Sequence, residues 1–189
     1  MSPTPLAQYL KESCEAIERT IASPSPHKVE EAIAAIMAAL RDDKPLLVCG
    51  NGGSASDAMH ITGELVGRFL KERKAINCIC LSCNPALLTA WANDFSYDTV
   101  FARQVEAYGK AGGALIGITT SGNSANVVCA FESARSLGVK TIGLTGEGGG
   151  KIAPLSDILI DVPSRRTPII QQLHICIYHY ICERIEAAY

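Results

Sequence analysis

The chain has 189 residues, of which 48% are hydrophobic and 19% charged, and its formal net charge is -2. This length suits one domain with a substantial core, and the charge balance lacks the basic excess that non-specific nucleic-acid binding requires. No uninterrupted apolar segment has the length of a signal peptide or a membrane span. We therefore expect a single soluble globular domain, residues 1–189, in the cytoplasm.

The eight cysteines raise the question of disulfides or a metal cluster. Six of them fall inside apolar strand or helix patterns, which predicts reduced, buried thiols that act as small hydrophobic residues: Cys49, Cys78, Cys80, Cys129, Cys176 and Cys182. Cys78, Cys80 and Cys83 lie close together, but structural zinc sites usually use a second cysteine pair, and the sequence has none. A cysteine-based metal site is therefore disfavoured.

Two amphipathic helices are predicted before the first strand, within residues 1–43. Thr4 caps the first helix and Pro5 opens it, and its apolar residues recur at helical spacing: Leu6, Tyr9, Leu10, Ala16, Ile17 and Ile21. After a break at residues 23–26, Ser25 caps the second helix and Pro26 opens it. Such a pair covers one face of a sheet or packs against the same pair in another subunit, and we favour the subunit contact.

In residues 44–189, short apolar runs alternate with helical patterns. The runs predict strands at residues 46–49, 78–81, 114–119, 141–144 and 158–162. The intervening patterns predict helices near residues 54–70, 85–92, 99–109, 124–137 and 167–188. This alternation is typical of an α/β fold with a doubly wound, five-stranded parallel sheet between helices on both faces. Ligands of such sheets bind beyond the carboxyl ends of the strands.

The predicted first strand leads into a glycine-rich loop and then a helix. Gly50, Gly52 and Gly53 permit a turn too tight for residues with a Cβ, and the loop directs backbone N–H groups and a helix N-terminus at one point. That arrangement suits a phosphate or another anion. On the helix, His60 and Glu64 are four residues apart and about 40° from each other around the axis. The stretch therefore predicts an anion site beside an acid/base or metal-binding pair.

Two nucleotide-binding motifs resemble this loop but do not fit. The run from Gly50 to Ala55 lacks the last glycine of the dinucleotide fingerprint, and the next strand ends in Ser82 and Cys83, where a ribose-binding carboxylate is needed. The Lys-Ser/Thr pair that closes a Walker loop is also missing. Nicotinamide and ATP sites are therefore disfavoured.

A second polar loop follows the predicted third strand, over residues 119–126. Its hydroxyl groups and the free N–H groups of the next helix form a neutral phosphate cup, although the same residues also suit a plain helix cap. The glycine loop expected at the same sheet edge favours the phosphate site. A third loop, residues 146–151, is rich in glycine as well, and we interpret it as an exposed turn.

The last predicted helix begins with Thr167 as its cap and Pro168 at its first position, and it stays largely apolar for four turns, which predicts a buried helix. Gln171 and His179 are eight residues apart, about 80° around the axis, so both can face one side at different depths. His174 faces another side. A lone histidine in an apolar helix is more often a hydrogen-bonded core residue than a ligand.

Taken together, the motifs resemble a known family. The strand followed by CGNGGSASDAMH and a glutamate, the pair Asn93 and Asp94, the segment TTSGNSANV and the closing Gln171 and His179 are similar to the phosphoheptose isomerase family of sugar-isomerase (SIS) domains. The resemblance implies a flavodoxin-like, three-layer αβα SIS fold in a homotetramer with active sites between subunits. It also implies isomerisation of sedoheptulose 7-phosphate to D-glycero-D-manno-heptose 7-phosphate, the first step toward the heptose of bacterial surface polysaccharides such as lipopolysaccharide.

The resemblance also implies roles for particular residues. Contacts to the sugar phosphate are expected from Asn51, Gly52, Gly53, Ser54, His60, Glu64, Asn93, Asp94, Thr119, Thr120, Ser121, Ser124 and Gln171. One zinc ion per subunit is expected on His60, Glu64, Gln171 and His179, with Glu64 and His179 as the acid/base pair. The segment TTSGNS is expected to hold most of the phosphate, while residues 51–54 shape the floor of the pocket.

These roles agree with the chemistry that isomerisation requires. A proton moves between adjacent carbons through an ene-diolate, for which a carboxylate can act as base, an imidazole can shuttle the oxygen proton and a divalent cation can hold both oxygens. Two histidines, a carboxylate and an amide oxygen form a plausible zinc set, but a metal-bound glutamate is a weaker base. Glu64 therefore either alternates between the two roles or works beside a supporting metal.

The chain departs from some relatives just before its last helix. Where they carry an acidic residue, this chain has Arg165 and Arg166, which we expect to be solvated. A second functional hypothesis is a non-catalytic SIS-domain binding protein of the replication-initiator-associating type. The presence of both Glu64 and His179 favours the enzyme, because a binding module needs no such pair.

Overall fold

Five parallel strands form the centre of the molecule. The computed structural model describes residues 5–189, and its strands are β1 (Leu46–Gly50), β2 (Cys78–Cys80), β3 (Ala114–Thr119), β4 (Lys140–Thr145) and β5 (Ile158–Asp161). They pair in the order β2-β1-β3-β4-β5, and every pairing is parallel. The chain changes direction across the sheet between β1 and β3, as in a doubly wound, flavodoxin-like sheet. The predicted fold class is confirmed.

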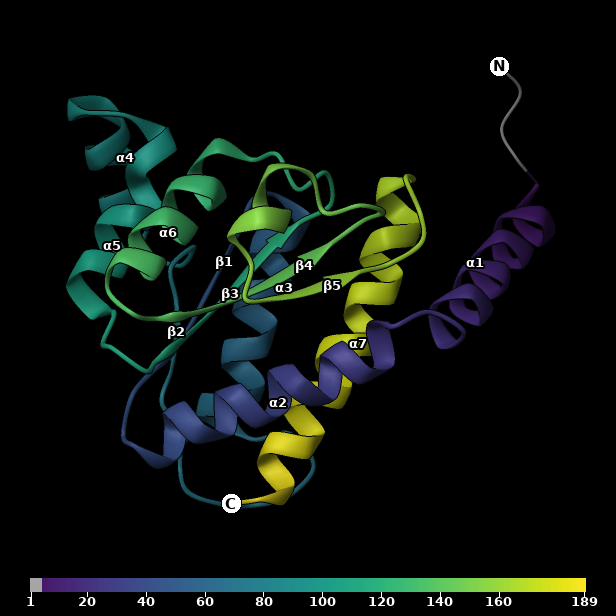
Figure 1. The fold of residues 1–189 in the computed structure, drawn as a ribbon, viewed down its shortest axis with the longest axis horizontal. Helices are drawn as coiled ribbons and strands as arrows, with labels where there is room; N and C mark the ends of the chain where they lie inside the picture. Colours follow the sequence, from purple (N-terminus) through teal and green to yellow (C-terminus); the bar gives the residue numbers. More distant parts are fainter. Residues whose placement is uncertain (1–4) are drawn as a thin grey trace.

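Within residues 5–189, the α-helices labelled in Figure 1 are α1 (Leu6–Ile21), α2 (Ser25–Arg41), α3 (Gly53–Thr62), α4 (Pro85–Asp94), α5 (Val100–Tyr108), α6 (Ala125–Ser136) and α7 (Thr167–Ala187). A π-helical turn, η1 (Gly63–Gly67), follows α3, and two 3-10 segments, η2 (Tyr97–Thr99) and η3 (Gly150–Leu155), precede α5 and β5. The helix predicted at residues 54–70 is therefore wrong at its end, because the backbone becomes extended at Arg68. Thr4, the expected first cap, lies outside the described residues.

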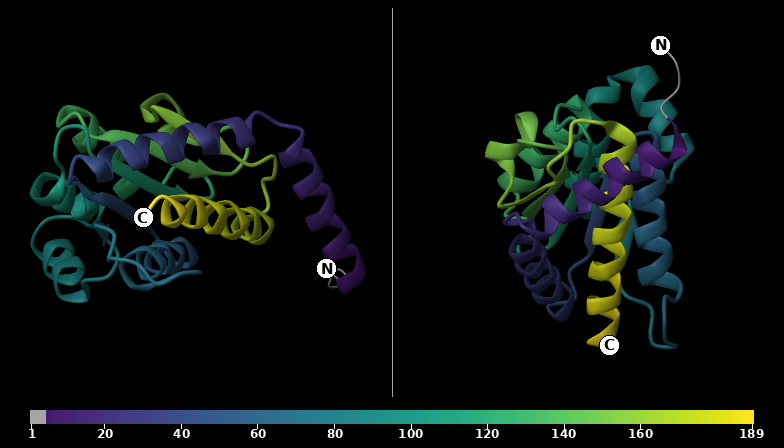
Figure 2. Two further views of the ribbon diagram at one scale, coloured as in Figure 1. Left: turned by 90° about the horizontal axis from the view of Figure 1, so that it is seen from below. Right: turned by 90° about the vertical axis from the view of Figure 1, so that its right-hand side faces the viewer.

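One face of the sheet is covered by α2, α3 and α7 (Figure 2). The buried stripe of α2 includes Ile36, which belongs to one cluster with Val48 of β1, Ile116 of β3 and Tyr178 of α7. Burying one such aliphatic side chain stabilises the fold by about 1.5–3 kcal/mol. This layer fixes α3 and α7 relative to the strands.

The other face is covered by α5 and α6. Phe101 and Phe131, both fully buried, pack in one cluster with Leu47 and Leu115 of the sheet. Gly117 makes this close approach possible, since a Cβ there would lie 2.3 Å from the Phe131 ring. The two helical layers with the sheet between them give the expected three-layer αβα arrangement.

The predicted N-terminal helical pair does not act as a unit. α2 lies on the sheet, whereas α1 angles away from it (Figures 1 and 2), and among Leu6–Ile21 only Ala16 is buried. The prediction that Ser25 caps α2 is wrong, because Ser25 is the first residue of the helix and its hydroxyl donates to the carbonyl of Asp161 (3.0 Å) instead. The subunit contact that we favoured for the pair therefore remains a prediction for α1 alone.

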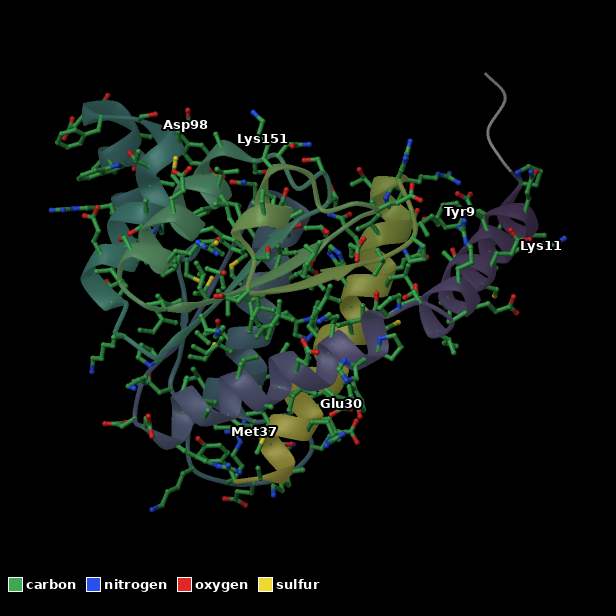
Figure 3. The ribbon with its side chains drawn as sticks, viewed as in Figure 1. Tyr9, Lys11, Glu30, Met37, Asp98 and Lys151 are labelled. Atoms are coloured by element: carbon green, nitrogen blue, oxygen red, sulfur yellow. The ribbon has the colours of Figure 1, made fainter. Side chains whose placement is uncertain are left out.

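α1 is attached to the start of α7 by polar contacts. The Arg166 guanidinium pairs with Glu12 and lies over the ring of Tyr9, 4.9 Å from its centroid. Tyr9, labelled in Figure 3, also accepts a hydrogen bond from Gln172 (2.9 Å). The expectation that Arg166 is solvated is therefore only partly right, because its side chain is 40% exposed but also pairs with α1. Arg165 is 86% exposed and pairs with a glutamate of the neighbouring loop.

The cysteines are all free thiols, and Cys49, Cys78 and Cys182 are buried as predicted. Cys80 and Cys129 are only half-buried and Cys176 is exposed, which corrects their assignment to the core. Cys176 lies on a side of α7 where Ile175 and Tyr180 are also exposed, because the apolar surface of this helix is wider than the face that packs on the sheet. α7 is therefore only partly buried. Within residues 5–189, no helix is long and apolar enough to cross a membrane.

His174 is a core residue, as its setting in the sequence predicted. It is fully buried, its Nε2 atom lies 3.2 Å from the Thr145 carbonyl oxygen, and burial lowers its pKa from 6.5 to about 4. Because the unfolded chain binds this proton more readily, the fold should lose about 3 kcal/mol of stability as the pH falls from about 6.5 to about 4. The free energy of unfolding, measured with urea, should fall less between pH 7 and pH 4 for His174→Gln than for the wild type. An equal fall in the two proteins would contradict the assignment of His174 as a buried, neutral core residue.

Candidate active site

The glycine loop after β1 forms the tight turn that the sequence predicts. Gly52 has φ +55°, a left-handed conformation that glycine adopts without steric cost, and α3 begins at Gly53. A Cβ on Gly50 would lie 2.6 Å from the carbonyl oxygen of Ser54, so the backbone closes tightly on itself. The N-terminus of α3 is thereby held at the carboxyl end of β1.

Asn51, in this loop, is held by two side chains that the sequence analysis missed. Its amide donates to Asn126 Oδ1 (2.8 Å) and accepts from Asn126 Nδ2 (2.9 Å), and the Tyr97 hydroxyl donates to Asn51 Oδ1 (3.0 Å). Asn126 is buried at the start of α6. Its place in the motif TTSGNSAN was a usable signal, whereas Tyr97 lies in no motif. The amide pair ties the loops after β1 and β3 together.

The loop after β3 lies at the same sheet edge, because β1 and β3 are neighbouring parallel strands. Thr119 ends β3, and its hydroxyl lies 3.0 Å from that of Ser124, which immediately precedes α6. Thr120 is half-buried and Ser121 is exposed. Hydroxyl groups and a helix N-terminus therefore meet at one point, as a phosphate cup requires.

The third loop, residues 146–151, supports the second. Gly122 has φ +68°, and a Cβ there would lie 2.0 Å from the Gly149 carbonyl oxygen. Gly149 is buried, whereas Glu147 and Gly148 are exposed. Our interpretation of this loop as an exposed turn is therefore only partly right, because part of it packs against the backbone of the predicted phosphate loop.

His60, Glu64 and His179 come together between α3, η1 and α7. His60 Nε2 lies 2.9 Å from Glu64 Oε1 and 3.5 Å from His179 Nε2, and one ligand atom of each residue lies within 4.8 Å of the others. A tetrahedral zinc ion with bonds of about 2.0–2.1 Å separates its ligand atoms by about 3.3 Å. The donor types and their spacing therefore fit a zinc ion. None of the three side chains is fully buried, so a substrate can reach them.

A buried hydrogen-bonded chain orients His60. Its Nδ1 atom lies 3.0 Å from the Tyr178 hydroxyl, which donates to Asp57 Oδ1 (3.4 Å). Burial raises the pKa of the Asp57 carboxyl, against the opposing effects of Tyr178 and His60, and burial also raises the pKa of the Tyr178 phenol. Because the Tyr178 hydroxyl donates its hydrogen bond to Asp57, its oxygen is left to accept one from the Nδ1–H group of His60, and Nε2 keeps its lone pair for a ligand. No sequence motif marks Asp57 or Tyr178 for this role.

Gln171, the fourth expected zinc ligand, lies away from the other three within this chain. A Cβ on Gly53 would lie 2.3 Å from Gln171 Nε2, so the amide packs against the first residue of α3. Eight residues of α-helix separate Gln171 from His179 by about 12 Å along the axis. A single chain therefore brings together His60, Glu64 and His179, but not Gln171.

Asn93 and Asp94 end α4 and are both exposed. The Asn93 amide donates to Asp94 Oδ1 (2.8 Å). Tyr97, three residues further on, is the residue that connects this segment to the glycine loop, through Asn51. The contacts that Asn93 and Asp94 were expected to make with substrate remain predictions.

Comparison with known proteins identifies the family of this chain. The SIS domain family model matches residues 8–146. The phosphoheptose isomerase of Crocosphaera subtropica is 50% identical over 159 residues, 84% of this chain and 81% of that protein. The phosphoheptose isomerase of Helicobacter pylori is 47% identical over 179 residues, 95% of this chain and 89% of that protein.

Solved structures give the same result. The structure of the phosphoheptose isomerase from Neisseria gonorrhoeae matches with a TM-score of 0.90 and 38% identity, covering 96% of this chain and 97% of that chain. A phosphoheptose isomerase from Francisella tularensis matches with a TM-score of 0.91 and 36% identity over 95% of each chain. Fold, motifs and similarity over most of the length thus agree, and this chain belongs to the phosphoheptose isomerase family of SIS domains.

Proposed function

We propose that this chain isomerises sedoheptulose 7-phosphate to D-glycero-D-manno-heptose 7-phosphate, as its family indicates. The observation that carries the proposal is the convergence of His60, Glu64 and His179 about two turns along α3 from the glycine loop. Proton carriers beside an anion-binding edge are what a sugar-phosphate isomerase needs. The relatives give no support to the alternative, a non-catalytic binding protein.

Glu64 and His179 are the acid/base pair in this proposal. Glu64 takes a proton from C1 of the ketose, while a protonated His179 gives its proton to the C2 oxygen, which forms the ene-diol. His179, now neutral, takes the hydroxyl proton from the C1 oxygen, while Glu64 returns its proton to C2, which leaves an aldehyde at C1 and both residues in their starting states. Their side chains both approach His60, so one substrate edge can reach both groups.

The two polar loops hold the phosphate end of the substrate. Thr119, Thr120, Ser121 and Ser124 provide hydroxyl groups at the N-terminus of α6, and residues 51–54 line the adjacent edge. Hydroxyl and N–H donors bind a phosphate without a lysine when a helix dipole adds to them. The Asn51–Asn126 amide pair keeps the two loops at a constant separation.

His60, Glu64 and His179 would hold a zinc ion, which when bound would supply a Lewis acid for the two substrate oxygens. The chain of Asp57 and Tyr178 behind His60 supports this assignment, because metal-binding histidines almost always have such a partner on the second ring nitrogen. Gln171 would complete a four-ligand site only from another copy of the chain.

A homotetramer is proposed from the surface around α1. Leu6, Leu10 and Ile21 are more than half exposed on this helix. Beside them, a groove of about 320 Å³ between α1, α2 and α7 is lined by apolar residues such as Ile17 and Leu173 and also by Glu30, which Figure 3 labels on α2. Apolar surface of this kind is typical of a subunit contact. The eight free thiols also suit the reducing cytoplasm that we propose as its location.

A panel of ketose phosphates, assayed with and without a chelator, tests reaction, substrate and metal together. We expect sedoheptulose 7-phosphate to be the preferred substrate, with activity lost on chelation and restored by zinc. Full activity in protein that the chelator has completely depleted of metal would contradict the zinc site but not the isomerase. Binding of the sugar phosphate without any aldose product would contradict the isomerase.

A further inference from the structure

A buried carboxylate at the end of α7 organises the loop that follows η1. Glu186 is 2% exposed, and its carboxylate accepts hydrogen bonds from the backbone N–H groups of Phe69 (3.0 Å), Leu70 (2.7 Å) and Lys71 (3.1 Å). Burial by itself would raise the pKa of this carboxyl, but the three N–H groups and the Arg73 guanidinium hold it below its usual value. The carboxylate is therefore the charged acceptor on which this loop is built.

Arg73 connects the same carboxylate to Glu64. Its side chain is 2% exposed, and Nε lies 3.3 Å from Glu186 Oε1. Nη2 donates to the carbonyl of Glu64 (2.6 Å), and Nη1 donates to that of Gly67 (2.9 Å). These carbonyls belong to the π-helical turn η1, which ends at Gly67 and has no further turn to satisfy them. The guanidinium therefore stabilises the irregular turn from which the Glu64 side chain projects.

Phe69 connects the carboxylate to His179. Its ring stacks on the His179 imidazole, with centroids 5.7 Å apart and planes inclined by 16°. The position of that ring depends on the backbone at Phe69, whose N–H is bound by Glu186. One buried ion pair is thus connected to both members of the proposed acid/base pair, directly to the main chain of Glu64 and through the Phe69 ring to His179.

We propose that the Arg73–Glu186 ion pair is a positioning device that holds Glu64 and His179 at a working separation: Arg73 binds the main chain of Glu64, and Glu186 binds the main chain of Phe69, whose ring stacks on His179. The proposal rests on the acid/base roles proposed above. A buried ion pair is weak as a source of net stability, because its desolvation offsets its attraction. Its value here is the geometry that it imposes at two places at once.

The first test is spectroscopic and needs no activity. The full-length protein has four histidines, so ¹³C-histidine labelling resolves the His179 ring, whose signals carry a ring-current shift from Phe69. Phe69→Leu should remove that shift, and Glu186→Gln should reduce it. Glu183→Gln, an exposed glutamate one turn earlier on α7, is the matched control and should leave it unchanged.

The second test is kinetic. Glu186→Gln and Arg73→Lys should lower kcat for sedoheptulose 7-phosphate by about 10- to 100-fold, with KM changed much less, because substrate contacts are intact while the proton carriers are displaced. Lysine keeps the charge of Arg73 but cannot reach two carbonyls with one planar fork. Glu183→Gln should stay within about twofold of wild type.

The outcomes separate this inference from the function on which it rests. If Glu186→Gln fails to fold, Phe69→Leu and Arg73→Lys carry the same test at smaller structural cost. An unshifted His179 signal in Glu186→Gln, or kcat equal to that of Glu183→Gln, would overturn the positioning role. Full turnover in Glu64→Gln and His179→Gln would instead overturn the acid/base roles, even where the His179 signal moves as expected.

Discussion

Glu64→Gln and His179→Gln should each lower kcat for sedoheptulose 7-phosphate by about 10²- to 10⁴-fold, the usual contribution of a positioned acid or base. Glutamine keeps the shape of Glu64 and retains a polar, hydrogen-bonding group at position 179, but it cannot carry the proton at either position. Substrate binding should change much less, because the phosphate is held by the loops after β1 and β3. Steady-state kinetics with a parallel binding measurement would show the split between kcat and affinity.

The control for this pair is Glu72→Gln, an exposed glutamate in the loop that follows η1. Its kcat should stay close to the wild-type value. Zinc content should be measured for every variant, because His60, Glu64 and His179 are also the proposed ligands. Wild-type turnover in both Glu64→Gln and His179→Gln would show that the proton transfer lies elsewhere.

Gly122→Ala should have the second largest effect, on both stability and substrate affinity. Its positive φ costs an alanine about 1–2 kcal/mol, and the new Cβ would lie 2.0 Å from the Gly149 carbonyl oxygen, so the backbone of one loop must move, at a further cost of about 1–3 kcal/mol. That displacement changes the proposed phosphate loop itself. We expect a lower free energy of unfolding and a raised KM.

Gly148→Ala is the matched control, because Gly148 also has a positive φ (+81°) but nothing lies within 4 Å of the added Cβ. It should lose only the conformational part of the stability and leave KM near the wild-type value. Denaturant unfolding and kinetics of the two variants would measure the difference. Equal losses in both would mean that the contact between Gly122 and Gly149 is unimportant.

The sheet and the two loops at its edge could be predicted from the sequence because their signals are local. The apolar run 46–49 and the glycines that follow it determine a strand and a tight turn within a few residues, and the structure has β1 (Leu46–Gly50) with Gly52 at φ +55°. The spacing of His60 and Glu64 likewise predicts one helix face, and their side chains meet at 2.9 Å. Period and turn chemistry are sufficient for such features.

The supporting contacts could not be predicted, because they join residues far apart in the chain. Asp57 and Tyr178 are 121 residues apart, and Leu70 and Glu186 are 116 apart. Each residue alone looks like an ordinary helix or loop residue. Only the folded structure shows that Tyr178 and Asp57 orient His60 and that Glu186 anchors the loop beside Glu64.

Gln171 shows a different limit of sequence reasoning. Helical periodicity predicts that Gln171 and His179 can share a side of α7, but it does not say what each residue faces. The rise along the helix places them about 12 Å apart, so one contacts the start of α3 and the other its end. A shared metal was implied by resemblance to the family, and within a single chain the geometry separates the two residues.

The most direct test of the account is a single-turnover experiment, with wild-type protein and the Glu64→Gln variant each in excess over sedoheptulose 7-phosphate. The account predicts that both bind the sugar phosphate, that the wild type forms D-glycero-D-manno-heptose 7-phosphate, and that the variant forms it at least about 100 times more slowly. Formation of the aldose at the same rate by both proteins would contradict it.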